Sequence, residues 1–267
     1  MATAPTAATT ATAAAYSSAP AFVHAAVAIV EQALERFPDL ALAVAYNGGK
    51  DSTVLLVLLQ LALSKRAAAA AAAKAGGDIG GGDDGDSGAD SSADSAAVGD
   101  GGDAAGLGCV RWVYFTEEDV FEEQEEFLAA SERRHALRLL RVGGGVKAGC
   151  AQLVAEHGVR AFLMGTRRSD PYAAELEPFA PSTAGWATCM RVNPVLDWSF
   201  EQVWSFIRLF GVNYCALYDR GFTSVGQRAN SQPNEQLRNE DGSYRPASEL
   251  RDAASERAGR DSSASSN

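Results

Sequence analysis

The 267-residue chain is predicted to form a single α/β domain, with a parallel, twisted sheet covered by helices on both faces. Short apolar stretches typical of buried strands alternate with longer segments whose apolar residues recur at helical spacing. This alternation is typical of β-α-β units, in which neighbouring strands are parallel. Roughly 175 residues lie outside low-complexity stretches, which is the size of one domain.

The elements follow in order along the first half of the chain. Residues 23–37 have helical spacing and end before Pro38, since the residue before a proline avoids helical geometry. Residues 40–45 form a short apolar strand, and residues 52–65 a helix so apolar that most of its faces should be buried. A second strand is predicted at residues 110–115.

The second half continues the alternation. An acidic helix at residues 119–134 should turn Phe121, Phe127 and Leu128 inward. The remaining strands are predicted at residues 137–142, 160–164 and 190–195. A helix at residues 146–157 is stopped by Gly158, and one at residues 199–210 is capped by Ser199.

Three stretches lack the large apolar residues needed to offset chain entropy. Residues 1–20 are rich in alanine and threonine and carry no charge, and residues 67–108 are mostly alanine, glycine, aspartate and serine. We expect both to be disordered, the second as an insert within a domain at residues 21–238. The polar tail at residues 239–267 should contain one short arginine-bearing helix at residues 248–260.

Composition excludes several function classes. The net charge is −11, but eight aspartates of the insert supply most of it and leave about −3 for the rest. No basic stripe suggests nucleic acid, and no apolar run reaches the ~18 residues of a membrane span. The four cysteines lie far apart, without the spacing of a zinc or iron–sulfur site. A cytoplasmic monomer without nucleic-acid or membrane partners is expected.

The most informative motif is the segment Tyr46-Asn47-Gly48-Gly49-Lys50-Asp51-Ser52, which joins the first strand to the apolar helix. Helix N-termini offer unpaired N–H groups and partial positive charge, and glycines permit close approach of an anion. Lys50 can neutralise a polyphosphate, Ser52 can cap the helix, and Asp51 can hold Mg²⁺ or orient the loop. The motif lacks Walker A spacing and instead resembles the pyrophosphate loop of ATP pyrophosphatases, with Asn47 at the usual serine position.

Other loops should reach the same edge of the sheet, because ligands of such sheets bind at the carboxyl ends of the strands. These are the residues after Phe115 and the segment 165–171, which carries Arg167, Arg168 and Asp170. Residues 213–226 are rich in turns and could close over a site. Near the end of the chain, Arg257 and Arg260 could clamp a phosphate if they share a helical face.

Taken together, YNGGKDS, GTRRSDP, NPVLDWSFEQVWSF, YCALYDRGFTSVG and ERAGR resemble eukaryotic FAD synthases (FMN adenylyltransferases) of the PAPS reductase-like superfamily. The resemblance covers residues 40–65, 110–230 and 248–260. It implies a fold similar to adenine nucleotide α-hydrolases and transfer of AMP from Mg²⁺·ATP to FMN, giving FAD and pyrophosphate.

The resemblance also implies roles for individual residues. The loop from Asn47 to Ser52 would bind ATP phosphates, and Tyr114 and Phe115 would hold adenine. The flavin and adenylate sites would be lined by Arg167, Asp170, Trp186 and Asn193. Arg257 and Arg260 would bind the FMN phosphate, and Lys50, Asp51, Arg257 and Arg260 would carry catalysis.

Two alternatives remain open at this point. A PAPS or adenylylsulfate reductase shares the fold but needs a nucleophilic cysteine near a mobile C-terminus, whereas the last cysteine here is Cys215. A catalytically inactive nucleotide- or flavin-binding protein would be the other. The intact Lys50, Asp51, Arg257 and Arg260 argue against the inactive protein.

Overall fold

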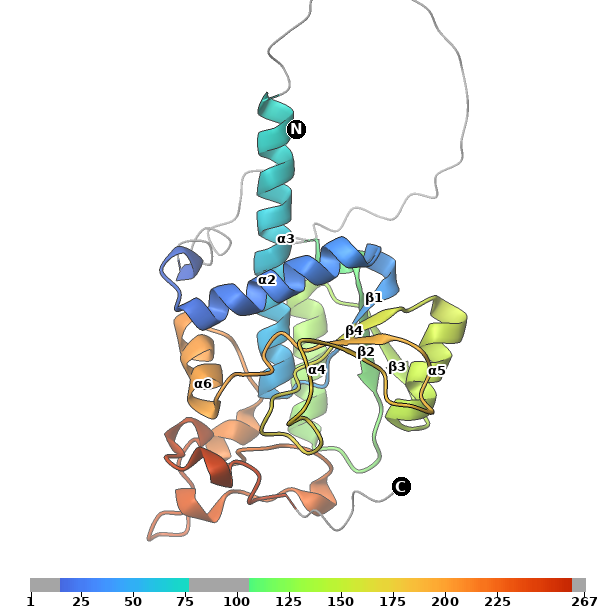
Figure 1. Cartoon of the computed structure of the whole chain (residues 1–267). Helices are drawn as coiled ribbons and strands as arrows, with labels where there is room; N and C mark the ends of the chain where they lie inside the picture. Colours follow the sequence, from blue (N-terminus) through green and yellow to red (C-terminus); the bar gives the residue numbers. More distant parts are fainter. Residues whose placement is uncertain (1–14, 77–105, 261–267) are drawn as a thin grey trace, which may run out of the picture.

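The computed structural model describes residues 15–76 and 106–260, which form one sheet with helices on both faces (Figure 1). Six short strands occur in the order β3-β2-β1-β4-β6-β5 across the sheet. They are β1 (Leu42–Ala45), β2 (Arg111–Phe115), β3 (Leu139–Val142), β4 (Ala161–Leu163), β5 (Phe179–Pro181) and β6 (Met190–Val192). Every pairing is parallel except that of β5 with β6. The predicted α/β class is therefore confirmed, with one antiparallel strand at the edge.

Five long helices cover the described sheet: α2 (Ala21–Arg36), α3 (Lys50–Gly76), α4 (Glu122–His135), α5 (Gly145–His157) and α6 (Phe200–Leu209). Buried side chains of α2, α3, α4 and α6 share the larger apolar core on one face. Residues of α5 pack into the smaller core on the other face. The strands alternate between the two: Val44 points to the larger core and Ala43 to the smaller.

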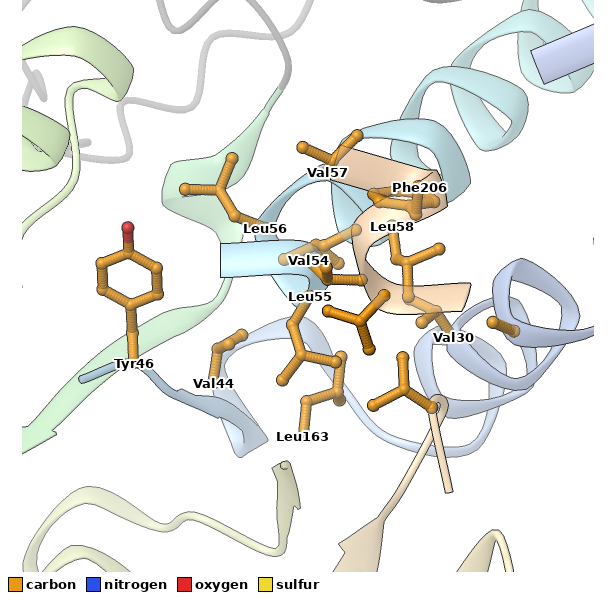
Figure 2. Close-up of a cluster of buried hydrophobic side chains, with 14 of the residues drawn as sticks. Val30, Val44, Tyr46, Val54, Leu55, Leu56, Val57, Leu58, Leu163 and Phe206 are labelled. Carbon is orange, nitrogen blue, oxygen red and sulfur yellow. The ribbon is translucent and has the colours of Figure 1, made fainter. Parts of the chain in front are cut away.

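The first turns of α3 form the centre of the larger core (Figure 2). Residues 54–59 are buried in succession, so the helix is enclosed on every side. It packs between the sheet residue Leu163, α2 with Val30, and α6 with Phe206. Fully burying each such side chain contributes roughly 1.5–3 kcal/mol, so the helix that carries the glycine loop is firmly held.

The structure differs from the predicted insert at both of its ends. α3 continues through residues 67–76, because alanine has the highest helix propensity and these residues are mostly alanine. At the other end Leu107 is buried and accepts a hydrogen bond from the indole of Trp112 at 2.9 Å. The rest of the predicted insert, residues 77–105, lies outside the described residues.

By length and composition, α3 could span a membrane. Its first half is buried inside the domain, however, and Lys65 and Arg66 form ion pairs with Glu31 and Asp39. The apolar character of the helix is thus explained by its place in the core.

The terminal segments are more ordered than predicted. Residues 15–17 form a helical turn, and the ring of Tyr16 packs on His24 with centroids 4.6 Å apart. Residues 239–260 pack against the domain, with Ala247 and Leu250 buried. The predicted helix at residues 248–260 is wrong, because the tail forms the short 3₁₀ turns Ala247–Glu249 and Ala253–Ser255. Residues 1–14 and 261–267 lie outside the described residues.

Smaller differences have local causes. The helix predicted from residue 119 begins at Glu122, because Asp119 adopts a left-handed backbone (φ 56°) and accepts a hydrogen bond from the N–H of Ala229. Strand β5 was not predicted, since three residues ending in proline carry no pattern. By contrast, Ser199 caps α6 with a complete capping box, and Gly158 ends α5 in the left-handed conformation, as predicted.

Candidate active site

A cavity of about 370 Å³ lies at the carboxyl ends of β1, β2 and β4. Its walls come from the glycine loop, the end of β2, the segment after β4, and the C-terminal third of the chain. The predicted site residues that line it are Asn47, Gly49, Lys50, Asp51, Ser52, Tyr114, Phe115, Asp170, Arg257 and Arg260. Segments separated by more than 200 residues therefore meet at the switch point of the sheet, where such folds bind ligands.

Asn47 shapes the glycine loop. Its Oδ1 accepts hydrogen bonds from the backbone N–H of Gly49 at 3.0 Å and from Ser52 Oγ at 2.9 Å. The first of these is an Asx turn, in which the side chain imitates a backbone turn. Gly48 adopts φ +74°, which disfavours side chains at that position. Gln124 holds the loop from α4 by donating to the Asn47 carbonyl at 2.8 Å.

The loop leads into the N-terminus of α3, which presents unpaired backbone donors. The N–H of Lys50 donates to the hydroxyl of Tyr218 at 2.8 Å, and that of Thr53 to the Gly49 carbonyl at 2.9 Å. Within the described residues no hydrogen bond occupies the N–H groups of Asp51 and Ser52. Both residues line the cavity, so free amides and the positive end of the helix dipole favour an anion there.

Gly165 allows the segment after β4 to approach this helix end. A Cβ at Gly165 would lie 2.9 Å from the Asp51 carbonyl carbon and 3.0 Å from the Ser52 nitrogen. Any larger residue would therefore push the segment carrying Asp170 away from the glycine loop.

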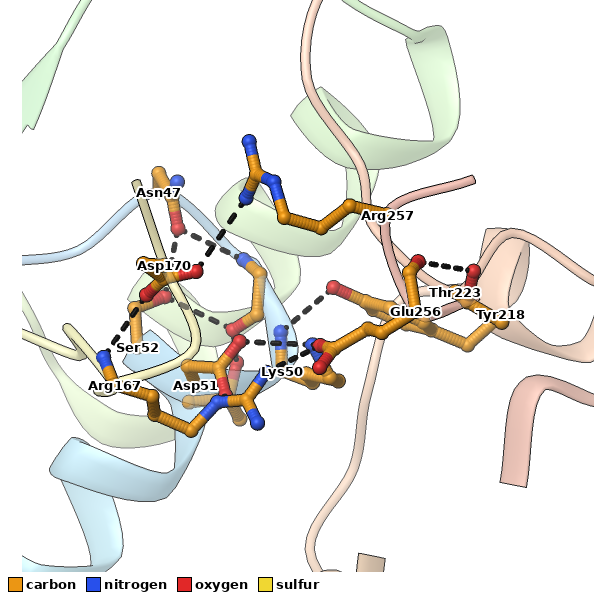
Figure 3. Close-up of polar contacts among 12 residues, drawn as sticks. Asn47, Lys50, Asp51, Ser52, Arg167, Asp170, Tyr218, Thr223, Glu256 and Arg257 are labelled. Atoms are coloured by element: carbon orange, nitrogen blue, oxygen red, sulfur yellow. Dashed lines mark hydrogen bonds and ion pairs between the residues drawn. The ribbon is translucent and has the colours of Figure 1, made fainter. Parts of the chain in front are cut away.

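Beneath the loop lies a cluster of four charged groups, of which three are buried and Asp51 is partly exposed (Figure 3). Lys50 Nζ lies 2.9 Å from Asp51 Oδ2 and 2.6 Å from Glu256 Oε1. Arg167 pairs with Asp51 through Nε at 2.8 Å and with Glu256 through Nη2. We call these four residues the ion cluster. Its two positive and two negative charges balance, as burial of charge requires.

The pKa values reflect this mutual neutralisation. Burial alone would lower the pKa of Lys50, but the charges of Asp51 and Glu256 outweigh it and hold that pKa above its ordinary value. Burial would likewise raise the pKa of Asp51, yet Lys50 and Arg167 keep it below its usual value. Lys50, Asp51 and Arg167 are thus held in their charged forms, which favours lasting ion pairs in the cluster.

The ion cluster bears on the roles predicted for two loop residues. Lys50 lines the cavity but is 2% exposed, and its ammonium is bound to two carboxylates, which compensate its charge. Asp51 also lines the cavity, and its Oδ1 faces Arg167 at 2.8 Å but has no hydrogen-bond partner among the described residues. Its role as an Mg²⁺ ligand stays a prediction. The helix end and other cations of the site add to the electrostatic attraction for phosphate.

The two tail arginines are such cations. Arg257 is about 41% exposed, and its side chain makes one long contact among residues 15–76 and 106–260, at 3.4 Å to Asp170. The guanidinium of Arg260 lies over Gly226, where a Cβ would come within 2.2 Å of it. Its Nε is buried with no hydrogen-bond partner among the described residues, and burial together with the nearby Arg257 lowers the pKa of Arg260. An anion between the two guanidinium groups would accept a hydrogen bond from the unpaired Nε and would offset the repulsion between the two arginines.

Another part of the cavity wall is formed by the end of β2. Tyr114 and Phe115 line the cavity together with Met164 from the end of β4. Burial raises the pKa of Tyr114 to about 12, so its hydroxyl stays protonated. Phe115 packs tightly on α5, since a Cβ on Gly149 would come within 2.8 Å of its ring. This wall provides a rigid, mostly apolar surface for a flat ring.

Four predicted residues do not line the cavity. Gly48 belongs to the loop but contacts α4 instead. Arg167 lies in the ion cluster, and Asn193 is fully buried and donates to the Glu177 carbonyl at 3.1 Å. Trp186 lies partly exposed, and its N–H donates to the Thr183 carbonyl in the turn between β5 and β6. The structure therefore gives no support for direct contact between these four residues and a ligand in the cavity.

Other residues of the site carry little signal in the sequence. Glu256 precedes Arg257 in a polar tail, and no periodic pattern marks it as buried. Gln124 lies in a helix among acidic residues, and its contact with Asn47 depends entirely on packing. Gly226 and Tyr218 belong to the turn-rich segment expected near the site, but the sequence does not reveal their contacts with Arg260 and Lys50.

The fold and site define a class: a mostly parallel α/β domain with a glycine loop suited to an anion, as in the PAPS reductase-like superfamily. The family model for the phosphoadenosine phosphosulfate reductase domain matches residues 146–233. A crystal structure of Candida glabrata FMN adenylyltransferase with FAD and inorganic pyrophosphate superposes with a TM-score of 0.72 at 20% identity. It covers 95% of this chain and 97% of that chain, which confirms the fold.

Sequence similarity narrows the class further. A probable FAD synthase of Schizosaccharomyces pombe is 30% identical over 232 residues, covering 86% of this chain and 76% of that protein. A probable FAD synthase of Caenorhabditis briggsae is also 30% identical, and the chain spans only 38% of its length. This protein belongs to the FAD synthase family, as its resemblance had indicated.

Proposed function

We propose that this protein is an FMN adenylyltransferase that transfers AMP from ATP to the phosphate of FMN, giving FAD and pyrophosphate. The observation that carries the proposal is that two groups of free hydrogen-bond donors, each suited to an anion, line one cavity. The free amides at the start of α3 form one, and Arg257 and Arg260 form the other. Two phosphorylated substrates need two such groups of donors.

In the proposed reaction, an oxygen of the FMN phosphate attacks the α-phosphorus of ATP. A phosphorus–oxygen bond forms as the bond between the α- and β-phosphates breaks, and pyrophosphate leaves. The α3 N-terminus binds the departing phosphates, and Arg257 and Arg260 hold the attacking group. Both arrangements neutralise charge that otherwise repels two anions, and holding the reactants together removes an entropic cost.

No general base is required, because the phosphate of FMN is already largely ionised near neutral pH. This agrees with the site, since His24, His135 and His157 are all outside the cavity lining. The wall of Tyr114 and Phe115 would receive the adenine ring.

Magnesium is part of the proposal as a companion of ATP. Mg²⁺ is usually held by substrate phosphates, water and one or two carboxylates. Three carboxylates line the cavity: Asp51, Glu117 and Asp170. Oδ1 of Asp51 is buried and has no hydrogen-bond partner among the described residues, and Glu117 has no ion-pair partner among them. Asp170 accepts from the Arg167 N–H at 2.9 Å, and its other oxygen makes a long 3.4 Å contact with Arg257. These three carboxylates would hold the ion, which would neutralise phosphate charge.

The reductase alternative is disfavoured because the described site has no cysteine thiol suited to nucleophilic attack. None of the four cysteines, all within the described residues, lines the cavity. Burial raises the pKa of Cys150 to about 11 and also raises that of Cys215, which suppresses the reactive thiolate. The match to an adenosine 5'-phosphosulfate reductase of Neisseria meningitidis covers only 26% of this chain.

The test is to incubate the purified full chain with FMN, ATP and MgCl₂ and to measure FAD by chromatography and pyrophosphate by a coupled assay. We expect FAD and pyrophosphate in equal amounts. Folded protein that binds ATP and FMN but forms neither product would instead support an inactive binding protein. Size-exclusion chromatography and cell fractionation would test a second part of the proposal, that the enzyme is a cytoplasmic monomer.

A further inference from the structure

Two consecutive tail residues attach to different parts of the site (Figure 3). The carboxylate of Glu256 reaches the ion cluster, where it contacts Lys50 and Arg167. The side chain of Arg257 extends above it, toward Asp170 at the cavity. The position of the Arg257 backbone is consequently tied to the anchor made by its neighbour.

Glu256 is held through both its side chain and its backbone. Its side chain is about 7% exposed and contributes one of the two negative charges that balance Lys50 and Arg167. Its carbonyl accepts a hydrogen bond from Thr223 Oγ1 at 2.6 Å, and the carbonyl of the preceding Ser255 accepts from Asn234 Nδ2 at 2.8 Å. Charge and backbone are thus both fixed.

Beyond Glu256 the attachments are weaker and suit a ligand-binding segment. Arg257 is exposed with a single 3.4 Å contact, and Arg260 has an unpaired buried Nε. The Gly259 carbonyl accepts from the N–H of Gln232 at 2.8 Å, which supports the chain but does not direct the two guanidinium groups. The firmly bound Glu256 is therefore followed by two arginines whose guanidinium groups have N–H donors free to bind a ligand.

We infer that Glu256 is a positioning residue, which couples the glycine loop to the tail and holds Arg257 and Arg260 over the cavity for the phosphate of the acceptor substrate. It touches no substrate itself and acts through Lys50 and Arg167. This inference rests on the proposed function for the identity of the acceptor, but the coupling of tail to loop does not depend on it.

The principal test is Glu256→Gln, which keeps the size of the side chain and removes its charge. We expect KM for FMN to rise at least tenfold, while KM for ATP changes less than threefold, since the amides of α3 remain in place. Trypsin should also cleave after Arg257 and Arg260 at least tenfold faster than in the parent protein, as followed by mass spectrometry without ligand. A purely structural residue would lower the melting temperature without separating the two KM values.

Two further variants complete the design. Glu249→Gln is the matched control, because Glu249 is an exposed tail carboxylate paired with Arg245 at 3.4 Å, and it should change neither measurement. Thr223→Val loosens the Glu256 backbone without altering charge, and it should shift both measurements in the same direction by a smaller factor. It also keeps the inference testable if Glu256→Gln does not fold.

The outcomes separate the two proposals. If the parent protein forms no FAD but Glu256→Gln exposes the tail to trypsin, the coupling holds and the proposed reaction is wrong. If the parent forms FAD and Glu256→Gln leaves both tail cleavage and KM for FMN unchanged, the positioning role is refuted. Equal rises in the two KM values would refute it as well.

Discussion

The hydroxyl of Tyr218 accepts a hydrogen bond from the backbone N–H of Lys50 at 2.8 Å, and both residues are about 2% exposed. This contact joins the short 3₁₀ helix Ala216–Arg220 to the first residue of α3. It satisfies one of the unpaired N–H groups of the helix and fixes the turn that precedes it. The end of α3 proposed to bind phosphate is therefore held in shape without a ligand.

Replacing Tyr218 with phenylalanine should reduce the loss of stability at high pH. Burial raises the pKa of Tyr218 to about 12, above its ordinary value of 10.0. Between these values the unfolded chain releases the proton more readily than the folded protein, so the free energy of unfolding falls as pH rises. This contribution is complete below pH 10 and is lost as pH rises toward 12.

Urea unfolding of the parent and of Tyr218→Phe between pH 9 and 11 would measure this effect. This range extends roughly one unit to either side of the ordinary tyrosine pKa. The variant should be less stable at the lower pH, having lost the hydrogen bond, and should show the shallower decline. Tyr172→Phe is the control, because Tyr172 is fully exposed and its removal should leave the slope unchanged. Equal slopes in the parent and in Tyr218→Phe would contradict the assignment.

Replacing Lys50 with methionine should destabilise the protein as well as reduce turnover. Without its ammonium, the ion cluster keeps two carboxylates and a single cation, Arg167. Breaking such a buried pair costs roughly 3–5 kcal/mol of unfolding free energy. The exposed pair of Lys65 with Glu31 offers the control, since Lys65→Met should cost no more than about 1 kcal/mol. A Lys50→Met variant as stable as the parent would mean that the cluster is not balanced as described.

Replacing either tail arginine with alanine should lower turnover with FMN at least tenfold, which is roughly 1.4 kcal/mol of transition-state stabilisation. Arg257 is exposed and joined only to Asp170, so its loss should barely alter the unfolding free energy. Steady-state kinetics and urea unfolding would be measured on Arg257→Ala, Arg260→Ala and the control Arg251→Ala, which lies in the exposed part of the tail. Normal turnover in both site variants would exclude these arginines from the reaction.

Replacing Gly226 with alanine should impair the site by displacing Arg260. The new methyl group would lie 2.2 Å from the guanidinium, so the side chain must move. We expect KM for FMN to rise several-fold, because the moved arginine no longer faces its anion. Gly143→Ala serves as the control, since its methyl would lie an ordinary 3.5 Å from Thr116 Oγ1. An unchanged KM for FMN in Gly226→Ala would show that Arg260 is free to rearrange at no cost.

Much of the fold could be predicted because its signals are local. The apolar run that becomes α3 is enclosed by the core, and Ser199 caps α6, since periodicity and capping depend on neighbours in the chain. The ends of the insert were harder to predict. The low-complexity composition of residues 67–76 hid their high helix propensity, which continues α3 through the alanines. The burial of Leu107 depends on tertiary packing, which composition does not show.

The sequence by itself determined the α/β class, the family and the glycine loop with its Asn47, all of which depend on short contiguous patterns. Tertiary structure decided where the charges go. Lys50 looks like a phosphate ligand in the sequence, but a carboxylate 206 residues away neutralises it in the ion cluster. The physical reason is that a buried charge must find a partner, and only folding brings Glu256 within reach.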